Sequence, residues 1–250
     1  MPLFNLAWRP SFFWDGRAPT LRAQVAEPIQ NPLEMHTTLP EVVSRVSATP
    51  EYPPLFAAAF GTTEVDFDRI ARALEQFLLT LVSYDSRFDR AQLQNGGIAD
   101  GGLTREERRG LELFNMESDP ANGIFGADCF HCHGGPMFTS LPFANNGLVA
   151  TENDFGRFSV TRLESDRGKF AVPSLRNVAL TAPYMHDGRF GTLEEVIEHY
   201  DHGVQRSATL DPNLTKHPAT GLGLSQSDKR ALVAFLKTLT DEKFVRGEGR

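Results

Sequence analysis

Apolar residues recur at helical spacing along much of this 250-residue chain. Residues 20–27 and 40–48 each predict a short helix, and residues 225–240 predict a longer amphipathic helix. The strongest pattern lies in residues 66–83, where one helical face collects these apolar side chains: Phe67, Ile70, Ala71, Leu74, Phe77, Leu78 and Leu81. The spacing indicates a protein built mainly of α-helices.

Two further segments begin with a helix-capping signal. Thr104 is followed three residues later by Glu107, and Thr192 is followed in the same way by Glu195. A threonine and a glutamate at this spacing can satisfy each other's backbone N–H groups at a helix N-terminus. We therefore predict that a helix follows each threonine.

Strand signals are weak. Residues 134–172 are rich in Gly, Asn and Phe without a clear period. Val160 and Phe170 lie in short stretches that could pair as strands, but they do not predict a substantial sheet. The fold class remains mainly α.

A Gly-rich break divides the chain. The sequence NGGIADGG, residues 95–102, lies between two helical regions and is typical of a connection between domains. We therefore predict one unit over residues 1–96 and a second over residues 97–250.

Composition and charge narrow the function classes. About 40% of the residues are hydrophobic, enough for a core, and the net charge of −7 argues against nucleic acid as the main partner. No apolar run approaches the ~20 residues that span a membrane, and the first residues do not resemble a signal peptide. Large apolar side chains crowd the N-terminus, and we expect their packing partner upstream of Met1: Phe4, Leu6, Trp8, Phe12, Phe13 and Trp14.

The chain's only two cysteines stand in a C-x-x-C-H motif, Cys129 to His133. This is the attachment motif of a c-type heme, in which each thiol forms a thioether with one porphyrin vinyl group. One helical turn separates the two sulfurs by the distance between the vinyls, and the histidine that follows points its imidazole at the iron.

Three other interpretations of the motif compete with heme. A structural zinc site needs four protein ligands, and the sequence has no second cysteine pair. A thioredoxin-like redox pair would require a βαβ context, which the pattern does not predict. The third alternative is a helical bundle with two stray thiols. Because covalent heme is attached outside the cytoplasm, heme predicts an exported, periplasmic protein, although this sequence contains no export signal.

The chain resembles the bacterial diheme cytochrome c peroxidases and their MauG-type relatives over nearly its whole length, and four segments carry the resemblance. They are FFWDGRAPTLRAQVAEPIQNPLEM (12–35), ALEQFLLTLVSYDSRFD (73–89), CFHCHGG (129–135) and VPSLRNVALTAPYMHDGRFGTLEEVIEHYDHG (172–203). The resemblance implies two cytochrome c-like domains, each with its own C-x-x-C-H motif. Residues 1–96 would be the remainder of the peroxidatic domain, with its heme motif upstream, and residues 97–250 a complete electron-transfer heme domain.

The resemblance assigns catalytic roles in the N-terminal part. Trp14 would relay electrons between two hemes; alternatively it is a core tryptophan. Gln24, Pro28 and Glu34 match the distal pocket of the peroxidatic heme, where a carboxyl moves a proton between the two peroxide oxygens. The alternative is that Gln24 and Glu34 are surface polar residues beside a Pro-rich turn.

In the C-terminal part, the resemblance makes His133 the proximal ligand of the heme iron. Tyr200 occupies the position where the peroxidases carry a methionine and the MauG-type enzymes a tyrosine. A phenolate is a hard donor that favours Fe(III). Met185 is the main alternative, because methionine is the usual partner of histidine in cytochromes c. His199, His202 or an open site remain further alternatives.

The resemblance also implies a calcium ion between the domains, to which Thr181 and Pro183 would contribute carbonyl oxygens. An ordinary turn is the alternative for these two residues. Arg176 would pair with a heme propionate, or else form a structural salt bridge. One departure is Ala127, which stands where the tryptophan-quinone-forming enzyme carries a surface tryptophan.

The predicted activity is reduction of hydrogen peroxide to water. Electrons would come from a small cytochrome or copper protein, enter at the C-terminal heme and pass Trp14. One alternative is a MauG-like oxidase that uses peroxide to oxidise a partner or a small molecule. Another is a single-heme electron carrier without catalysis. The resemblance further suggests a homodimer.

Overall fold

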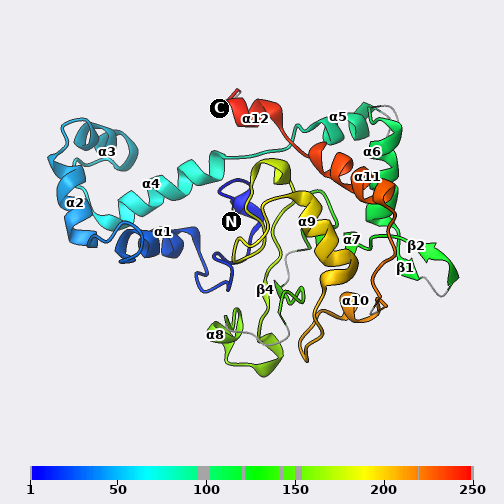
Figure 1. Ribbon diagram of the computed structural model, residues 1–250. Helices are drawn as coiled ribbons and strands as arrows, with labels where there is room; N and C mark the ends of the chain where they lie inside the picture. Colours follow the sequence, from blue (N-terminus) through cyan, green and yellow to red (C-terminus); the bar gives the residue numbers. More distant parts are fainter. Residues whose placement is uncertain are drawn as a thin grey trace. The chain divides into compact units, whose positions relative to one another are not determined.

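The computed structural model describes residues 2–94, 102–119, 122–140, 143–149, 154–218 and 220–248, and helices dominate its regular structure (Figure 1). The chain divides into two compact units, Leu3–Val82 and Ser83–Arg250. The predicted boundary lies among residues 95–101, outside the described residues. The two compact units meet earlier in the chain, between Val82 and Ser83. The predicted mainly α fold class is confirmed. None of the helices within the described ranges combines the length and the apolar character needed to cross a membrane.

The N-terminal unit packs its helices around a small apolar core. Its core residues are Val25, Ile29 and Ala71, and they are flanked by less buried apolar side chains. Its helical elements are η1 (Leu6–Trp8), α1 (Leu21–Gln30), α2 (Leu39–Ala48), α3 (Tyr52–Phe60) and α4 (Phe67–Thr80).

The apolar stripe of α4 is only partly buried. Ile70 and Leu78 are buried as expected, but Leu74 and Phe77 are 40% and 57% exposed. These two exceptions correct the predicted core, because the stripe is wider than the surface against which α4 packs. Of the crowded N-terminal side chains, Phe12 is buried whereas Trp8 is exposed.

The C-terminal unit is mostly helical, with two small antiparallel β-ladders, β1–β2 and β3–β4. Phe170 lies in β4, but Val160 lies in a short helix rather than a strand. The elements are α5 (Arg87–Gln94), α6 (Arg105–Asn115), β1 (Ser118–Asp119), β2 (Ile124–Phe125), α7 (Phe130–His133), β3 (Phe143–Ala144), α8 (Phe158–Thr161), η3 (Glu164–Asp166), β4 (Phe170–Ala171), η4 (Val178–Leu180), α9 (Leu193–Glu198), η5 (His199–Gly203), α10 (Pro212–Thr215), α11 (Gln226–Lys237) and α12 (Glu242–Arg246).

Both predicted capping boxes are present. The Thr104 side chain accepts a hydrogen bond from the backbone N–H of Glu107, and the Glu107 carboxylate accepts one from the N–H of Thr104. Thr192 and Glu195 form the same reciprocal pair at the start of α9. These local bonds explain why the two helices begin where the sequence predicts.

The core of the C-terminal unit forms where α6 crosses α11 (Figure 1). A Cβ atom at Gly110 of α6 would lie 2.0 Å from the backbone oxygen of Ala231 of α11, so only glycine permits this close approach. Beside the crossing, the Phe114 and Phe235 rings pack edge to face with centroids 5.2 Å apart.

The end of α6 holds the segment that leads into α7. The backbone N–H of Ala127 donates to the Leu113 oxygen at 2.8 Å, and that of Asp128 donates to the Met116 oxygen at 3.0 Å. The position of the cysteine motif in α7 therefore follows from the packing of α6.

The buried carboxylate of Asp128 is a second anchor for α7. It accepts hydrogen bonds from His131 Nδ1 at 2.6 Å and His217 Nε2 at 3.0 Å, and it pairs with Lys216 Nζ at 2.8 Å. Burial alone would raise the pKa of the Asp128 carboxyl, but these three partners outweigh burial and hold the pKa below its usual value. The carboxylate thus ties α7 to the chain after α10.

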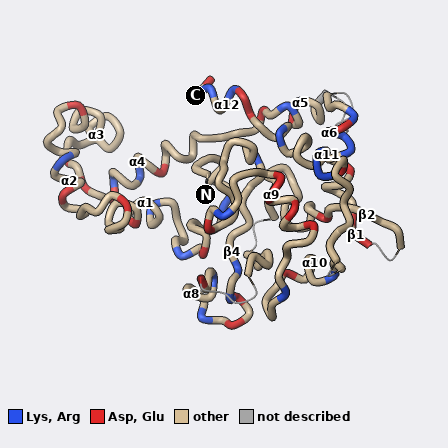
Figure 2. Tube along the Cα trace, viewed as in Figure 1, with Lys and Arg blue, Asp and Glu red and all other residues tan. Residues whose placement is uncertain are grey.

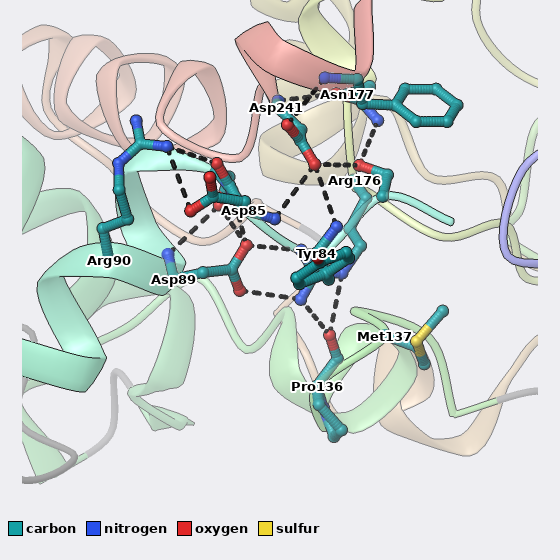
Figure 3. A network of polar contacts seen from close by, with 12 residues as sticks. Tyr84, Asp85, Asp89, Arg90, Pro136, Met137, Arg176, Asn177 and Asp241 are labelled. Carbon is teal, nitrogen blue, oxygen red and sulfur yellow. Dashed lines mark hydrogen bonds and ion pairs between the residues drawn. The ribbon is translucent and has the colours of Figure 1, made fainter. Parts of the chain in front are cut away.

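A second buried carboxylate, that of Asp241, fixes the first residues of this unit (Figure 3). One of its oxygens accepts hydrogen bonds from the Ser83 hydroxyl at 3.2 Å and from the backbone N–H groups of Tyr84 and Asp85, each at 3.0 Å. The Asn177 side chain closes the network by donating to the Ser83 hydroxyl at 2.9 Å. These bonds explain why the compact unit begins at Ser83.

Gly110→Ala tests the helix crossing. Alanine is the better helix former, yet its Cβ would overlap a backbone atom that cannot rotate away. We expect the free energy of unfolding, measured by urea denaturation, to fall by about 1–3 kcal/mol. Gly191→Ala is the control, because the nearest atom to its Cβ, at 3.7 Å, is the end of a flexible glutamate. Equal stability of the two variants would contradict this account of the crossing.

The Asp128 anchor predicts a pH dependence of stability. Because the folded pKa is depressed, the carboxylate stabilises the fold above its unfolded pKa of about 4, and this contribution is lost as the pH falls through the folded pKa. Urea unfolding between pH 3 and 7 should show a steeper loss of stability at low pH in the wild type than in Asp128→Asn. The control, exposed Asp154→Asn, should keep the wild-type profile. Parallel profiles for the wild type and Asp128→Asn would contradict the prediction.

Candidate functional site

The cysteine motif lies on α7, with Cys129 at the N-cap position. The backbone N–H of His133 donates to the Cys129 oxygen at 2.9 Å, which closes one helical turn. Residues three apart on a helix share one face, so Cys129 and Cys132 present both sulfurs to the same side. Both cysteines are free thiols.

A backbone carbonyl group orients the His133 imidazole. Its Nδ1 lies 3.2 Å from the Phe138 backbone oxygen, and a proton on Nδ1 leaves the lone pair of Nε2 for a metal. Burial lowers the pKa of His133 to about 4, so the ring is neutral at neutral pH. This environment suits a metal ligand, and the role of His133 as proximal heme ligand stays a prediction.

The thiols are poorly suited to redox exchange or to zinc. Burial raises the pKa of Cys129 to about 12 and that of Cys132 to about 11, whereas a redox-active pair needs a lowered pKa. Two clusters of three candidate metal-ligating side chains occur among the described residues, and neither contains a cysteine. The motif in this setting favours heme over both alternatives.

The surroundings fit a bulky prosthetic group. Cys129, Cys132, His133 and Tyr200 are each partly buried. A cavity of about 520 Å³ also adjoins His133, within the size range of ligand sites, and aromatic rings form part of its lining: Phe88, Phe114 and Phe138.

Met185 and Tyr200 are the two main candidates for the sixth ligand, and both lie beside the side chain of Asn146. Its Nδ2 donates to the Met185 sulfur at 3.3 Å and lies 3.5 Å from the Tyr200 hydroxyl. Tyr200 sits in the π-helix η5, an irregularity frequently found at functional sites, and burial raises the pKa of its hydroxyl. Met185 has a left-handed backbone with φ of 70°, an uncommon conformation for a side chain of this kind.

The neighbouring histidines are engaged elsewhere. His199 Nε2 donates to the Asn146 backbone oxygen at 2.9 Å, and exposed His202 lies 3.4 Å from the Glu198 carboxylate. The His186 ring stacks on that of Phe170, with centroids 3.5 Å apart. The geometry therefore favours Tyr200 or Met185 over a histidine.

Arg176 forms a buried salt bridge. Its Nη1 and Nη2 bind the two Asp89 oxygens at 2.7 and 2.8 Å, and its Nε donates to the Pro136 oxygen at 3.0 Å (Figure 3). Burial alone would raise the pKa of the Asp89 carboxyl, but Arg176 and Ser86 hold it below its usual value. Arg176 thus forms the structural salt bridge that was the alternative to pairing with a heme propionate. Pairing with a propionate stays a prediction.

Thr181 and Pro183 follow η4 and are exposed. The Thr181 hydroxyl donates to the Val178 oxygen at 3.1 Å. Their contribution to a calcium site stays a prediction.

The N-terminal unit brings together the three predicted residues of the distal pocket. Gln24 and Pro28 lie one turn apart on α1, and the Pro28 oxygen accepts a hydrogen bond from the Met35 N–H at 3.1 Å. This bond folds the turn that carries Glu34 back towards the end of α1. The Glu34 carboxylate is exposed and accepts a hydrogen bond from Asn31 Nδ2 at 2.8 Å.

Trp14 belongs to the same unit and is half-buried. Its neighbour Phe13 lies beneath the Arg17 guanidinium, whose carbon is 3.6 Å from the ring centroid. An electron relay through Trp14 stays a prediction.

Two site residues escaped the sequence analysis. Asp128 directly precedes the motif, but nothing in the sequence indicates that His217 approaches it. Asn146 lies in a segment without a recognisable pattern, 39 residues from Met185. Both act through contacts between distant segments, which local spacing does not reveal.

Comparison with known proteins identifies the family. Residues 1–96 match the model of the family described as di-haem cytochrome c peroxidase. The methylamine utilization protein MauG of Methylorubrum extorquens is 38% identical over 244 residues, 96% of this chain and 64% of that protein. The cytochrome c551 peroxidase of Nitrosomonas europaea is 37% identical over 245 residues, 96% of this chain and 65% of that protein. The chain thus spans slightly less than two thirds of the length of these two relatives.

A solved structure agrees in fold as well as in sequence. A MauG-like protein associated with microbial copper homeostasis superposes with a TM-score of 0.82 at 33% identity, over 97% of this chain and 75% of that chain. A shared fold at this identity, together with the two sequence relatives, shows common descent. The chain therefore belongs to the diheme cytochrome c peroxidase and MauG family.

Proposed function

We propose that this chain carries the electron-transfer heme of a peroxidase that reduces hydrogen peroxide to water. The observation that supports this most strongly is α7, which presents two thiols on one face and a neutral His133 whose Nδ1 faces the Phe138 backbone oxygen. Cys129 and Cys132 would form the two thioether bonds, and His133 would be the proximal ligand. The bound heme would supply reversible one-electron chemistry at its iron.

Tyr200 is the proposed sixth ligand. Its hydroxyl lies near the Asn146 amide and is buried with the thiols, so the side chain sits inside the same unit as the heme motif. A phenolate would stabilise Fe(III) and give this heme a lower potential than a thioether would.

The N-terminal unit would handle protons at a peroxidatic heme. Glu34 is exposed beside the end of α1, close in the chain to the turn on Pro28, so its carboxyl is free to reach a substrate. There it would move a proton from one peroxide oxygen to the other, which favours heterolytic cleavage. Two electrons and two protons then convert one peroxide molecule into two waters, and Trp14 would relay the electrons.

The proposed electron donor is a small cytochrome or copper protein. Acidic and basic residues are interspersed along the chain (Figure 2). Acidic residues outnumber basic ones, and the resulting net charge of −7 suits a donor with a basic surface. A periplasmic location, calcium at Thr181 and Pro183, and a homodimer belong to the same proposal.

One observation favours a second candidate, a MauG-like oxidase that uses peroxide to oxidise a partner or small molecule. Tyr200, rather than a methionine, stands at the ligand position, and its hydroxyl faces Asn146. The tryptophan-quinone-forming enzyme uses a surface tryptophan at the position of Ala127. Ala127 is only 7% exposed and carries no aromatic ring, which argues against oxidation of a partner by that route.

Covalent attachment is the first test. When the chain is expressed with a cytochrome c maturation system, its intact mass should increase by one heme. Cys129→Ala/Cys132→Ala should lose this increase, because no thioether can form, and the exposed Ser159→Ala control should keep it. A wild-type chain without covalent heme would contradict the proposal.

Glu34→Gln tests the catalytic assignment. In a protein that joins this chain to a segment carrying the peroxidatic heme, we expect peroxide turnover with a reduced small cytochrome to fall about 10²- to 10⁴-fold, the usual contribution of general acid–base catalysis. Glu51→Gln, an exposed acid of the same unit, is the matched control and should keep the wild-type rate. Reversible one-electron cycling without turnover by the wild-type protein would instead support a single-heme electron carrier.

A further inference from the structure

We propose that Asn146 is a positioning residue that selects Tyr200 over Met185 as the sixth ligand of the heme iron. The inference rests on the proposed function, since it requires heme at Cys129, Cys132 and His133. It deepens that function by naming the side chain that decides the chemistry of the distal ligand, and with it the potential of the iron.

The first argument is the place of the Asn146 amide. Its Nδ2 approaches the Met185 sulfur to 3.3 Å and the Tyr200 oxygen to 3.5 Å, so one group contacts both candidate ligands. A primary amide has two N–H donors, one for each acceptor. The Asn146 amide can therefore donate a hydrogen bond to each of the two candidate ligands.

The second argument is that Asn146 lies on rigidly held backbone. The adjacent Asn145 is 1% exposed, and its Nδ2 donates to the hydroxyls of Ser207 and Thr209 at 3.2 and 3.0 Å. On the other side, the oxygen of Gly147 accepts a hydrogen bond from the Gln205 N–H at 2.7 Å. Because the backbone is fixed on both sides of Asn146, its side chain can hold a ligand in one orientation.

Gly147 adds to this rigidity. Its φ is 67°, and a Cβ atom there would lie 2.6 Å from a methyl carbon of Val204 and 2.8 Å from the Gln205 oxygen. Glycine is therefore required for the chain to turn directly after Asn146.

Asn146 is also tied to the element that carries Tyr200. Its backbone oxygen accepts the hydrogen bond from His199 Nε2 at 2.9 Å, one residue before Tyr200 in η5. Side chain and backbone thus contact consecutive residues of the π-helix. Movement of Asn146 would therefore displace the tyrosine.

The third argument is chemical. A phenolate oxygen that binds iron is anionic, and hydrogen bonds to charged acceptors are roughly twice as strong as those between neutral groups. A thioether sulfur is a weak acceptor, and an N–H bound to it occupies a lone pair that could otherwise serve the iron. Both effects favour Tyr200 as ligand and disfavour Met185.

Substitution of Asn146 in the heme-loaded protein tests the proposal. Asn146→Leu removes both donors, and Asn146→Asp keeps the shape of the side chain but places a negative charge beside the phenolate. We expect the ratio of tyrosinate- to thioether-ligated ferric heme, read from visible and EPR spectra, to fall at least about tenfold in each variant. The reduction potential should rise, because a thioether favours Fe(II).

Two comparisons complete the test. Asn146→Leu/Met185→Leu should show no thioether ligation, because the competing sulfur is gone, and the exposed Asn122→Leu should keep the wild-type spectrum and potential. Wild-type spectra and potentials in both Asn146 variants would overturn the role of Asn146 while leaving Tyr200 as the ligand. Thioether ligation in the wild type would overturn the ligand assignment of the proposed function together with this inference.

Discussion

The close crossing of α6 and α11 is the constraint on which the C-terminal unit depends. The two backbones approach so closely at Gly110 that any side chain there would meet the oxygen of Ala231. This contact orients the end of α6, and the end of α6 holds Ala127 and Asp128 by backbone hydrogen bonds. The position of the cysteine motif is thus a consequence of helix packing, refined by the buried Asp128 carboxylate.

The two sides of the site are prepared in different ways. On the proximal side, a short helix and the Phe138 carbonyl set the orientation and tautomer of His133. On the distal side, no regular helix performs this task. Instead, a π-helix presents Tyr200, and the clamped segment around Asn146 holds it. The proposed distal ligation would therefore depend on a few polar contacts.

Local features of the fold could be predicted from the sequence, and non-local ones could not. The capping boxes at Thr104 and Thr192 formed as expected, because each is complete within four residues. The heme motif is equally local. By contrast, α5 has a weak apolar pattern and was not predicted, and the exposure of Phe77 depends on how much of α4 its neighbours cover. The convergence of Met185 and Tyr200 on Asn146 joins three distant segments, which no spacing rule could foresee.

Iron K-edge X-ray absorption of the ferric, heme-loaded protein tests the central claim most directly, because sulfur and oxygen scatter distinguishably from the first shell of the metal. The account predicts covalently bound heme whose iron has only nitrogen and oxygen neighbours, with His133 on one side and Tyr200 on the other. Because nitrogen and oxygen scatter alike, Tyr200→Phe identifies the tyrosine: the number of light-atom neighbours of the iron should fall by one. A sulfur neighbour in the wild-type protein would contradict the account, and would show that Met185 is the ligand.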